Sequence, residues 1–253
     1  MNREIIIFHF SIALHKKIMP SLAKWLGDTL ESVMASKFIQ VKLTGKELVA
    51  PAVVKLYFEG NLQGIPFHEG NAVAFRVNQI DYRNYTPSYW DDSGCEIIVH
   101  LHSNGPGSRF FEQIQPGAQL KMLIPRGRKM FDNSFATHTV IFDETGLGYA
   151  TSVFEASSKN GQEFYAFGNV PGPVNNIRFP FNATNAKNGQ YHLLEQDFQA
   201  FLDRYWIAAK QGAFYMVGNG KLVQITRNVL RSRGIQRQQL FTYTYWIEGR
   251  KGL

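Results

Sequence analysis

The stretch DNSFATHTVIFDETG, residues 132–146, marks the point at which the hydrophobic pattern of the chain changes. Before it, apolar runs are short and separated by glycines; after it, apolar strands alternate with amphipathic helices. Short, evenly spaced strands are typical of an antiparallel barrel or sandwich, whereas strand–helix alternation is typical of a parallel sheet. The sequence therefore predicts an α+β protein of two domains, an antiparallel β-barrel followed by an α/β domain with a parallel sheet.

The predicted barrel lies on the N-terminal side of this stretch. Its apolar runs are residues 38–43, 53–58, 72–77, 95–101 and 119–124. Segments containing glycine separate the runs, and a helix at 108–113 interrupts them. Upstream, apolar residues at helical spacing predict an amphipathic helix over 21–36. We place the domains at 1–36 (helical extension), 37–132 (barrel) and 133–253 (α/β domain).

The predicted α/β domain follows the stretch. Its strands are expected at residues 138–142, 163–167, 213–217 and 240–246. Apolar residues at helical spacing predict helices around 198–206 and 222–230. The segment 168–190 is rich in Asn, Gly and Pro without periodicity, so it is expected to be an irregular surface segment.

The positive charge of the chain is unevenly distributed. Its 27 Lys and Arg against 20 Asp and Glu give a formal charge of +7. Residues 204–253 hold nine basic residues and one acid, while residues 1–203 hold 18 basic and 19 acidic residues. A uniformly basic coat is therefore excluded. Local positive fields attract anions in general, namely nucleic acid, a membrane surface, nucleotide phosphates or an anionic chelate.

The cysteine content and the N-terminus bear on the compartment. The single cysteine, Cys95, excludes an internal disulfide and the paired-cysteine zinc and redox motifs, and favours a reducing compartment. The apolar run at 5–14 is interrupted by His9 and followed by basic residues without a small-residue cleavage site. It is also too short to span a bilayer. We therefore expect a cytoplasmic protein that does not bind membranes.

The first candidate site is Arg83-Asn84-Tyr85-Thr86-Pro87, between the run that ends near Val77 and the one that begins at Cys95. A flavin dinucleotide needs a guanidinium for its pyrophosphate, an aromatic ring to stack on the isoalloxazine, and a hydroxyl near the polar edge of that ring. This segment supplies all three. The alternative is an ordinary loop with a salt-bridged arginine and a half-buried tyrosine.

The second candidate site is HSNGPGS at 102–108, followed by RFFEQI. The pattern predicts a strand, a glycine turn and a helix with Ser108 as N-cap, an arrangement that presents backbone N–H groups to an anion. Such joints commonly contain Gly-Pro, so alone the pattern is weak. Together with Arg83 it makes a second element that would contact phosphate.

These motifs resemble those of the siderophore-interacting proteins, ferric-siderophore reductases among the ferredoxin-reductase-like flavoproteins. The RxYTP at 83–87 resembles the family's FAD motif, and the HxxGPxS at 102–108 resembles its HGxGPAS turn. The DETGL at 143–147 resembles its GDETAL segment, and the YWIEG at 245–249 resembles its GYWxxG terminus. The resemblance covers roughly residues 38–253. It implies an FAD-dependent reductase that passes electrons from NAD(P)H through the flavin to a ferric siderophore and releases ferrous iron.

The chain departs from the family pattern at several positions. Ser103 and Gly107 stand where the family usually has Gly and Ala, and Ile124 replaces the glycine of the family's GPRG. Gly218-Asn219 replaces the family's Gly-Glu pair near the C-terminus. The match is therefore closer for FAD than for the nicotinamide nucleotide.

The resemblance assigns cofactor contacts residue by residue. On the FAD side they are Arg83, Tyr85, Thr86, Pro87, His102, Gly105, Pro106, Gly107 and Ser108; on the nicotinamide side they are Asp143, Thr145, Gly146 and Trp246. From the residues alone, the segment DETG is also compatible with a strand-to-helix turn capped by Asp or Thr. No catalytic acid or base is expected, because the cofactor carries the redox chemistry.

The acceptor site is expected at basic residues. Arg126 and Arg128 follow a barrel strand, and Arg250 and Lys251 follow the C-terminal Tyr-Trp pair. If they converge, they form a positive pocket for an anionic ferric chelate; the alternative is a solvated basic face. His100 and His102 share one face of a strand, but no third ligand of suitable type is near in sequence, so no metal site is expected.

Other functions stay open at this point. One is an NAD(P)H:flavin or ferredoxin-type oxidoreductase with another acceptor, and reduced ferredoxin is an alternative electron donor. Another is a non-catalytic ligand-binding module. Nucleic-acid binding is disfavoured because the sequence has no helix-turn-helix, zinc-finger or RNP motif. We expect a monomer.

Overall fold

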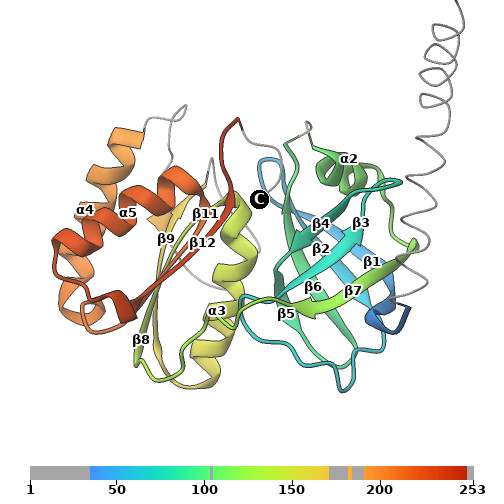
Figure 1. The fold of residues 1–253 in the computed structure, drawn as a ribbon, viewed down its shortest axis with the longest axis horizontal. Helices are drawn as coiled ribbons and strands as arrows, with labels where there is room; N and C mark the ends of the chain where they lie inside the picture. The colour runs from blue at the N-terminus through green and yellow to red at the C-terminus, as the bar shows by residue number, and fades with distance from the viewer. Residues whose placement is uncertain (1–34, 103–104, 171–181, 184–190, 250–253) are drawn as a thin grey trace, which may run out of the picture.

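The computed structural model describes residues 35–102, 105–170, 182–183 and 191–249, and its first domain is an antiparallel barrel (Figure 1). Its elements are η1 (Ala35–Lys37), β1 (Phe38–Ala50), β2 (Val53–Glu59), β3 (Ala72–Arg76), β4 (Tyr82–Tyr85), β5 (Pro87–Trp90), β6 (Gly94–His100), α2 (Pro106–Gln113) and β7 (Gln119–Arg126). Among these residues the sheet order is β4-β3-β7-β1-β2-β6-β5. The outermost strands, β4 and β5, are joined through the single residue Thr86, so the edges of the sheet meet and the barrel closes there.

Alternation between inward-facing and outward-facing residues explains the barrel. Val41 and Leu43 of β1 and Leu56 and Phe58 of β2 point inward, as the two-residue period of a strand requires. Phe111 of α2 closes one end of this core. Lys46 binds the C-terminal end of α2, because its Nζ donates to the carbonyl oxygens of Phe111 and Glu112 at 2.8 and 2.9 Å.

The second domain is a parallel sheet with helices on both faces. Its elements are β8 (Thr137–Asp143), η2 (Glu144–Gly146), α3 (Leu147–Lys159), β9 (Glu163–Asn169), β10 (Asn182–Ala183), α4 (Tyr191–Ala209), β11 (Ala213–Asn219), α5 (Gly220–Ser232), η4 (Arg237–Gln239) and β12 (Leu240–Trp246). The order β10-β9-β8-β11-β12 places the reversal of the chain between β8 and β11. Ligands of such sheets bind at the carboxyl ends of the strands beside this switch point.

Helix α3 lies between the two domains, while α4 and α5 cover the opposite face of the parallel sheet (Figure 1). Its residues Leu147, Tyr149 and Val153 share one buried cluster with Val53 and Ile98 of the barrel. Because the apolar core is continuous across the boundary, the two domains are packed as one body.

The observed fold confirms the predicted class, and the differences are local. Helix α3 differs from the prediction: it is buried on both sides and lacks the polar face that marks an amphipathic helix, so its sequence gives no clear helical pattern. Residues 82–90, outside the predicted strands, form β4 and β5. The predicted helix at 21–36 lies almost wholly outside the described residues, as does most of 168–190. No helix of the described residues is long and apolar enough to cross a membrane.

Candidate functional site

The two predicted FAD motifs meet at Gly107. This residue lies in the first turn of α2, and a Cβ there would overlap the hydroxyl of Tyr85 and lie 3.2 Å from Cγ of Arg83. Any side chain at this position would therefore push the turn away from β4. Glycine allows the N-terminal end of α2, which favours negative charge, to lie directly against the arginine and tyrosine of the first motif.

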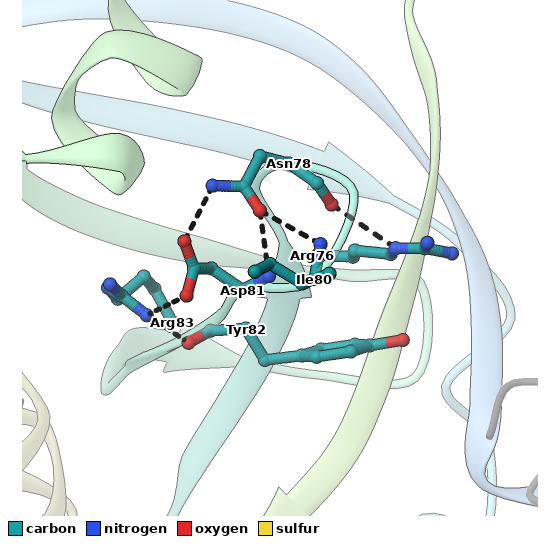
Figure 2. Close-up of polar contacts among 6 residues, drawn as sticks. All are labelled: Arg76, Asn78, Ile80, Asp81, Tyr82 and Arg83. Atoms are coloured by element: carbon teal, nitrogen blue, oxygen red, sulfur yellow. Dashed lines mark hydrogen bonds and ion pairs between the residues drawn. The ribbon is translucent and has the colours of Figure 1, made fainter. Parts of the chain in front are cut away.

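Arg83 is held beside this turn by the hairpin that precedes it (Figure 2). Asn78 organises the hairpin, since its Oδ1 accepts from the backbone N–H groups of Ile80 and Asp81 and its Nδ2 donates to Asp81 Oδ2. Asp81 Oδ1 lies 3.7 Å from Arg83 Nη1, which also donates to the carbonyl oxygen of Tyr82 at 2.8 Å. The Arg83 side chain is 41% exposed, so its guanidinium can reach a phosphate in solution.

Tyr85 packs against two aromatic rings of the barrel core. Its ring centroid lies 5.0 Å from that of Phe111 in an edge-to-face arrangement, and it also contacts Phe75. Burial raises the pKa of the Tyr85 phenol, partly offset by the charge of Arg83. The ring is therefore a neutral, fixed aromatic surface beside the α2 turn.

Thr86, at the corner where the barrel closes, reaches the second domain. Its Oγ1 lies 3.0 Å from the Tyr245 hydroxyl of β12, and either oxygen can donate. Its carbonyl oxygen would lie 2.8 Å from a Cβ on Gly148 of α3, so α3 approaches the corner closely. Pro87 begins β5 and is buried. Of the Tyr-Trp pair, Trp246 is the predicted site residue, but Tyr245 is the one that contacts the predicted flavin motif.

Asp143 ends β8 and is only 2% exposed. Its Oδ1 accepts from Thr145 N and Oγ1 at 2.9 and 2.5 Å and from Gly146 N at 3.2 Å. Its Oδ2 accepts from Asn219 N of β11 at 2.7 Å and from Trp246 Nε1 of β12 at 2.9 Å. Burial raises the pKa of Asp143, while these five donors oppose that shift. A direct contact between Asp143 and a nucleotide stays a prediction; in this structure the carboxylate fixes Thr145 and Trp246.

Residues around Asp143 define the edge of the parallel sheet. Thr145 is half-buried and Trp246 is 36% exposed, so both present atoms to solvent at the carboxyl ends of β8 and β12. A Cβ on Gly146 would lie 2.6 Å from Cγ2 of Val217, which explains the need for glycine in this turn.

The remaining predicted residues are placed less centrally. The His102 ring packs against Gly105, since a Cβ added to Gly105 would lie 2.9 Å from the imidazole Cε1. Pro106 and Ser108 belong to the first turn of α2. Gly105, rather than Ser108, is the N-cap residue. The rings of His100 and His102 are 5.8 Å apart, on one face as expected. Among the described residues no group of three His, Cys, Asp or Glu side chains is arranged to hold a metal ion.

The basic residues assigned to the acceptor are only partly described. Arg126 Nη2 donates to Asn84 Oδ1 at 2.8 Å. Asn84 alternates with Arg83 and Tyr85 along β4, so Arg126 lies on the other face of this strand. Arg128 is exposed two residues further along. Arg250 and Lys251 lie outside the described residues, so convergence of the four cations stays a prediction.

The residues at this site fit an FAD molecule. Gly107 lets the α2 turn pack tightly on β4, which brings its backbone N–H groups next to the exposed guanidinium of Arg83, an arrangement that suits a pyrophosphate. Tyr85 and the hydroxyl of Thr86 lie on the same short segment, as an isoalloxazine ring requires. The Cys95 thiol is not part of the site: it is buried, and burial raises its pKa to about 12.

No family model and no curated protein matches the sequence. Solved structures do match. The siderophore-interacting protein SipS from Aeromonas hydrophila is 17% identical over 85% of this chain and 93% of its own, with a TM-score of 0.68. A siderophore utilization protein from T. fusca is 19% identical over 86% and 95%, with a TM-score of 0.66. Ferredoxin-NADP+ reductase from Plasmodium falciparum, in an H286L mutant, is 14% identical over 82% and 96%, with a TM-score of 0.69.

These likenesses establish the fold. The chain has the two-domain fold of the ferredoxin-reductase-like proteins, an antiparallel barrel joined to a parallel α/β domain. Siderophore-interacting proteins, which the sequence motifs resemble, are among the structures that share it.

Proposed function

We propose that the protein is an FAD-dependent reductase that transfers electrons from NAD(P)H through the flavin to a ferric siderophore. The observation that carries the proposal is the meeting of Arg83, Tyr85 and the α2 turn at Gly107. Two sequence motifs separated by a whole strand supply there the phosphate-binding and ring-stacking groups that one dinucleotide needs. Two of the structures with the same fold are named for siderophores, which supports the choice of acceptor.

On the barrel side, Arg83 and the backbone N–H groups of the α2 turn bind the pyrophosphate. Tyr85 supports the ring, and the hydroxyl of Thr86 hydrogen-bonds its polar edge. A bound FAD would supply the two-electron oxidation of NAD(P)H and the one-electron reduction of ferric ions, which weakens the chelate. The protein contributes binding and orientation, so no acid or base of the chain is assigned to the reaction.

On the other side, Thr145 and Trp246 bind the nicotinamide nucleotide at the carboxyl ends of β8 and β12. Asp143 keeps both in place, with a buried carboxylate that accepts from each. Tyr245 contacts Thr86 and so lies where the two cofactor sites adjoin. Reduced ferredoxin is the alternative donor.

The acceptor is an anionic ferric chelate, bound by Arg126 and Arg128 together with Arg250 and Lys251. The positive charge of the last fifty residues favours such a substrate. We place the reaction in the cytoplasm, where the lone and buried Cys95 stays reduced.

The test begins with the purified protein and FAD. We expect a yellow protein with a flavin spectrum, and ferrous iron trapped by a ferrous-specific chelator when NADH or NADPH is added with a ferric tris-catecholate. Reduced ferredoxin is tried as a third donor, and ferricyanide as an acceptor that needs no siderophore site. A protein that takes up no FAD would refute the proposed reductase activity. A flavin-loaded protein that reduces ferricyanide but reduces no ferric siderophore model would refute the ferric siderophore as acceptor.

A further inference from the structure

One acid–base contact crosses the boundary between the domains. Glu144 follows Asp143 in η2 of the α/β domain, and His100 ends β6 of the barrel. His100 Nδ1 lies 3.4 Å from Glu144 Oε1, and the two side chains are only 20% and 15% exposed. The proposed electron transfer uses neither group.

The surroundings of this pair disfavour charge on both partners. Burial raises the pKa of Glu144 to about 7, and the neighbouring Asp143 carboxylate acts in the same direction. Burial lowers the pKa of His100 to about 4, and His102 adds to that effect. The imidazole is therefore neutral at neutral pH, while the carboxyl group is poised to gain or lose a proton there.

Other titratable groups surround the Glu144–His100 pair. The charged groups that act on the pair are Asp143 of β8, beside Glu144, and His102 beyond β6, beside His100. Tyr245 of β12 acts in turn on Asp143, and burial raises the pKa of its phenol, so it stays protonated. Asp143 is held by its five donors. Glu144 is the group of the pair whose pKa lies near neutral pH.

The pair also adjoins the proposed cofactor site on two sides. From His100, the ring of His102 extends to Gly105 at the start of α2. From Glu144, the neighbouring Asp143 connects to Trp246 on β12. A pyrophosphate at the α2 turn therefore adds its negative charge on the far side of His102 from the pair, in a poorly solvated environment where charges interact more strongly than in water.

We propose that Glu144 and His100 form a proton-binding site that takes up a proton from solvent when the FAD pyrophosphate adds negative charge at the α2 turn. The proton binds Glu144 Oε1 and is directed at the neutral Nδ1 of His100. The inference rests on the proposed function, because FAD is the ligand that brings the charge. Its consequence is a pH-dependent affinity for the cofactor.

The pair is first tested in the flavin-free protein. Carbon-13 label at the glutamate carboxyl carbons lets each group be titrated by NMR, and the Glu144 signal is assigned by its loss in Glu144→Gln. We expect this signal to titrate near pH 7. A Glu144 signal that titrates near pH 4.5, the range of an ordinary glutamate, would overturn the proton site whether or not FAD binds.

The coupling is then tested by calorimetry of FAD binding in buffers that differ in ionisation heat. We expect proton uptake by the wild-type protein between pH 7 and 8, and an affinity that falls by up to about tenfold per pH unit. Glu144→Gln should bind FAD without proton uptake. Glu59→Gln is the control, because this exposed carboxylate ends β2 opposite Gly94, at the far end from the Val53–His100 pair.

The outcomes separate the two proposals. Binding of FAD by the wild-type protein with no proton uptake would overturn this inference and leave the reductase standing. Equal uptake by the wild-type and Glu144→Gln proteins would also overturn it. Failure of the wild-type protein to bind FAD would overturn the proposed function, and the inference with it.

Discussion

The indole N–H of Trp246 donates to the buried carboxylate of Asp143 across 2.9 Å, joining the ends of β12 and β8. The same Oδ2 accepts from the backbone of Asn219 on β11, which lies between these two strands in the sheet. One carboxylate therefore fixes three strand ends at the switch point. Since ligands of such sheets bind there, the rigidity of the site depends on a group that itself has little contact with solvent.

Replacing Asp143 with Asn should destabilise the fold. An amide oxygen can replace only one carboxylate oxygen, and the NH₂ group would face donors at the other position, leaving them unpaired. We expect a loss of roughly 3 kcal/mol in the free energy of unfolding, measured with urea. The exposed Asp197 of α4 is the control, and Asp197→Asn should be neutral. Stability of Asp143→Asn within about 0.5 kcal/mol of wild type would show that the network contributes little.

Replacing Gly218 with alanine should also destabilise the fold, for two separable reasons. Its φ is +113°, and a Cβ there would overlap the Asp143 carboxylate. Gly117 has a similar φ, +101°, but no atom lies within 4 Å of its Cβ position. Gly117→Ala should therefore cost only the backbone strain, about 1–3 kcal/mol, and Gly218→Ala clearly more. Equal losses in urea unfolding would mean that the crowding of Asp143 has no energetic weight.

The two-domain layout was predictable because it depends on period and spacing. Inward residues of β1 and β2 alternate as a strand requires, and the buried strands β8 and β11 read as continuous apolar runs. Helix α3 was not predictable in this way, since its environment is set by contacts with a second domain. β4 and β5 are short and interrupted by Thr86, so neither shows a clear period.

The site was predictable only at the level of motifs. The sequence motifs predict that Arg83 and the turn at Gly107 both contact the cofactor. Their contact with each other depends on how α2 packs on β4, which no local pattern encodes. The Tyr245–Thr86 contact joins residues 159 positions apart and has no local signal. The role of Asp143 was partly predictable. A capping Asp in the DETG turn is one of the two interpretations of that segment, and Asp143 does accept from the backbone N–H groups of Thr145 and Gly146.

Gly107→Ala should weaken FAD binding through its contact with Tyr85. The added methyl group would displace either the α2 turn or the tyrosine ring, and we expect at least about a tenfold loss of affinity, equivalent to 1.4 kcal/mol. Removal of the obstructing hydroxyl in the double variant Gly107→Ala/Tyr85→Phe should restore most of it, because the ring remains. Affinity is measured by flavin fluorescence quenching. An unaffected Gly107→Ala variant, or no rescue, would contradict the assigned geometry.

Arg83 and Arg76 provide a matched pair on one hairpin. Arg83 can contact a phosphate by leaving Asp81, whereas Arg76 donates to the carbonyl oxygen of Asn78 (Figure 2). Arg76 also donates to the carbonyl oxygen of Gln79. We expect Arg83→Ala to lower FAD affinity by about 1.5–3 kcal/mol, the range for a charge-assisted hydrogen bond. Arg76→Ala should leave affinity unchanged. A similar loss in both variants would indicate an effect of the hairpin rather than of the Arg83 guanidinium.

A buried histidine connects the parallel sheet to the segment between the domains. His138 of β8 lies with Nδ1 3.1 Å from the Tyr215 hydroxyl and Nε2 3.1 Å from Gln162 Oε1. Gln162 Nε2 donates to the carbonyl oxygen of Phe135, so its Oε1 accepts and Nε2 of the imidazole carries the hydrogen. The Tyr215 hydroxyl then donates to Nδ1 and accepts from the Asp132 backbone N–H. This arrangement satisfies each group only while the imidazole is neutral.

The stability of the protein should therefore depend on the protonation of His138. Burial lowers its pKa in the folded state, so below the ordinary value near 6.5 the unfolded chain binds a proton that the folded protein resists. The stabilising contribution of His138 is present above pH 6.5 and is lost as the pH falls. We expect the stability difference between wild type and His138→Gln, measured by urea unfolding, to shrink from pH 7.5 to pH 5. The exposed His68 is the control, and His68→Gln should keep the pH dependence of wild type. A difference between wild type and His138→Gln that stays constant over this range would mean that the folded protein accommodates the imidazolium.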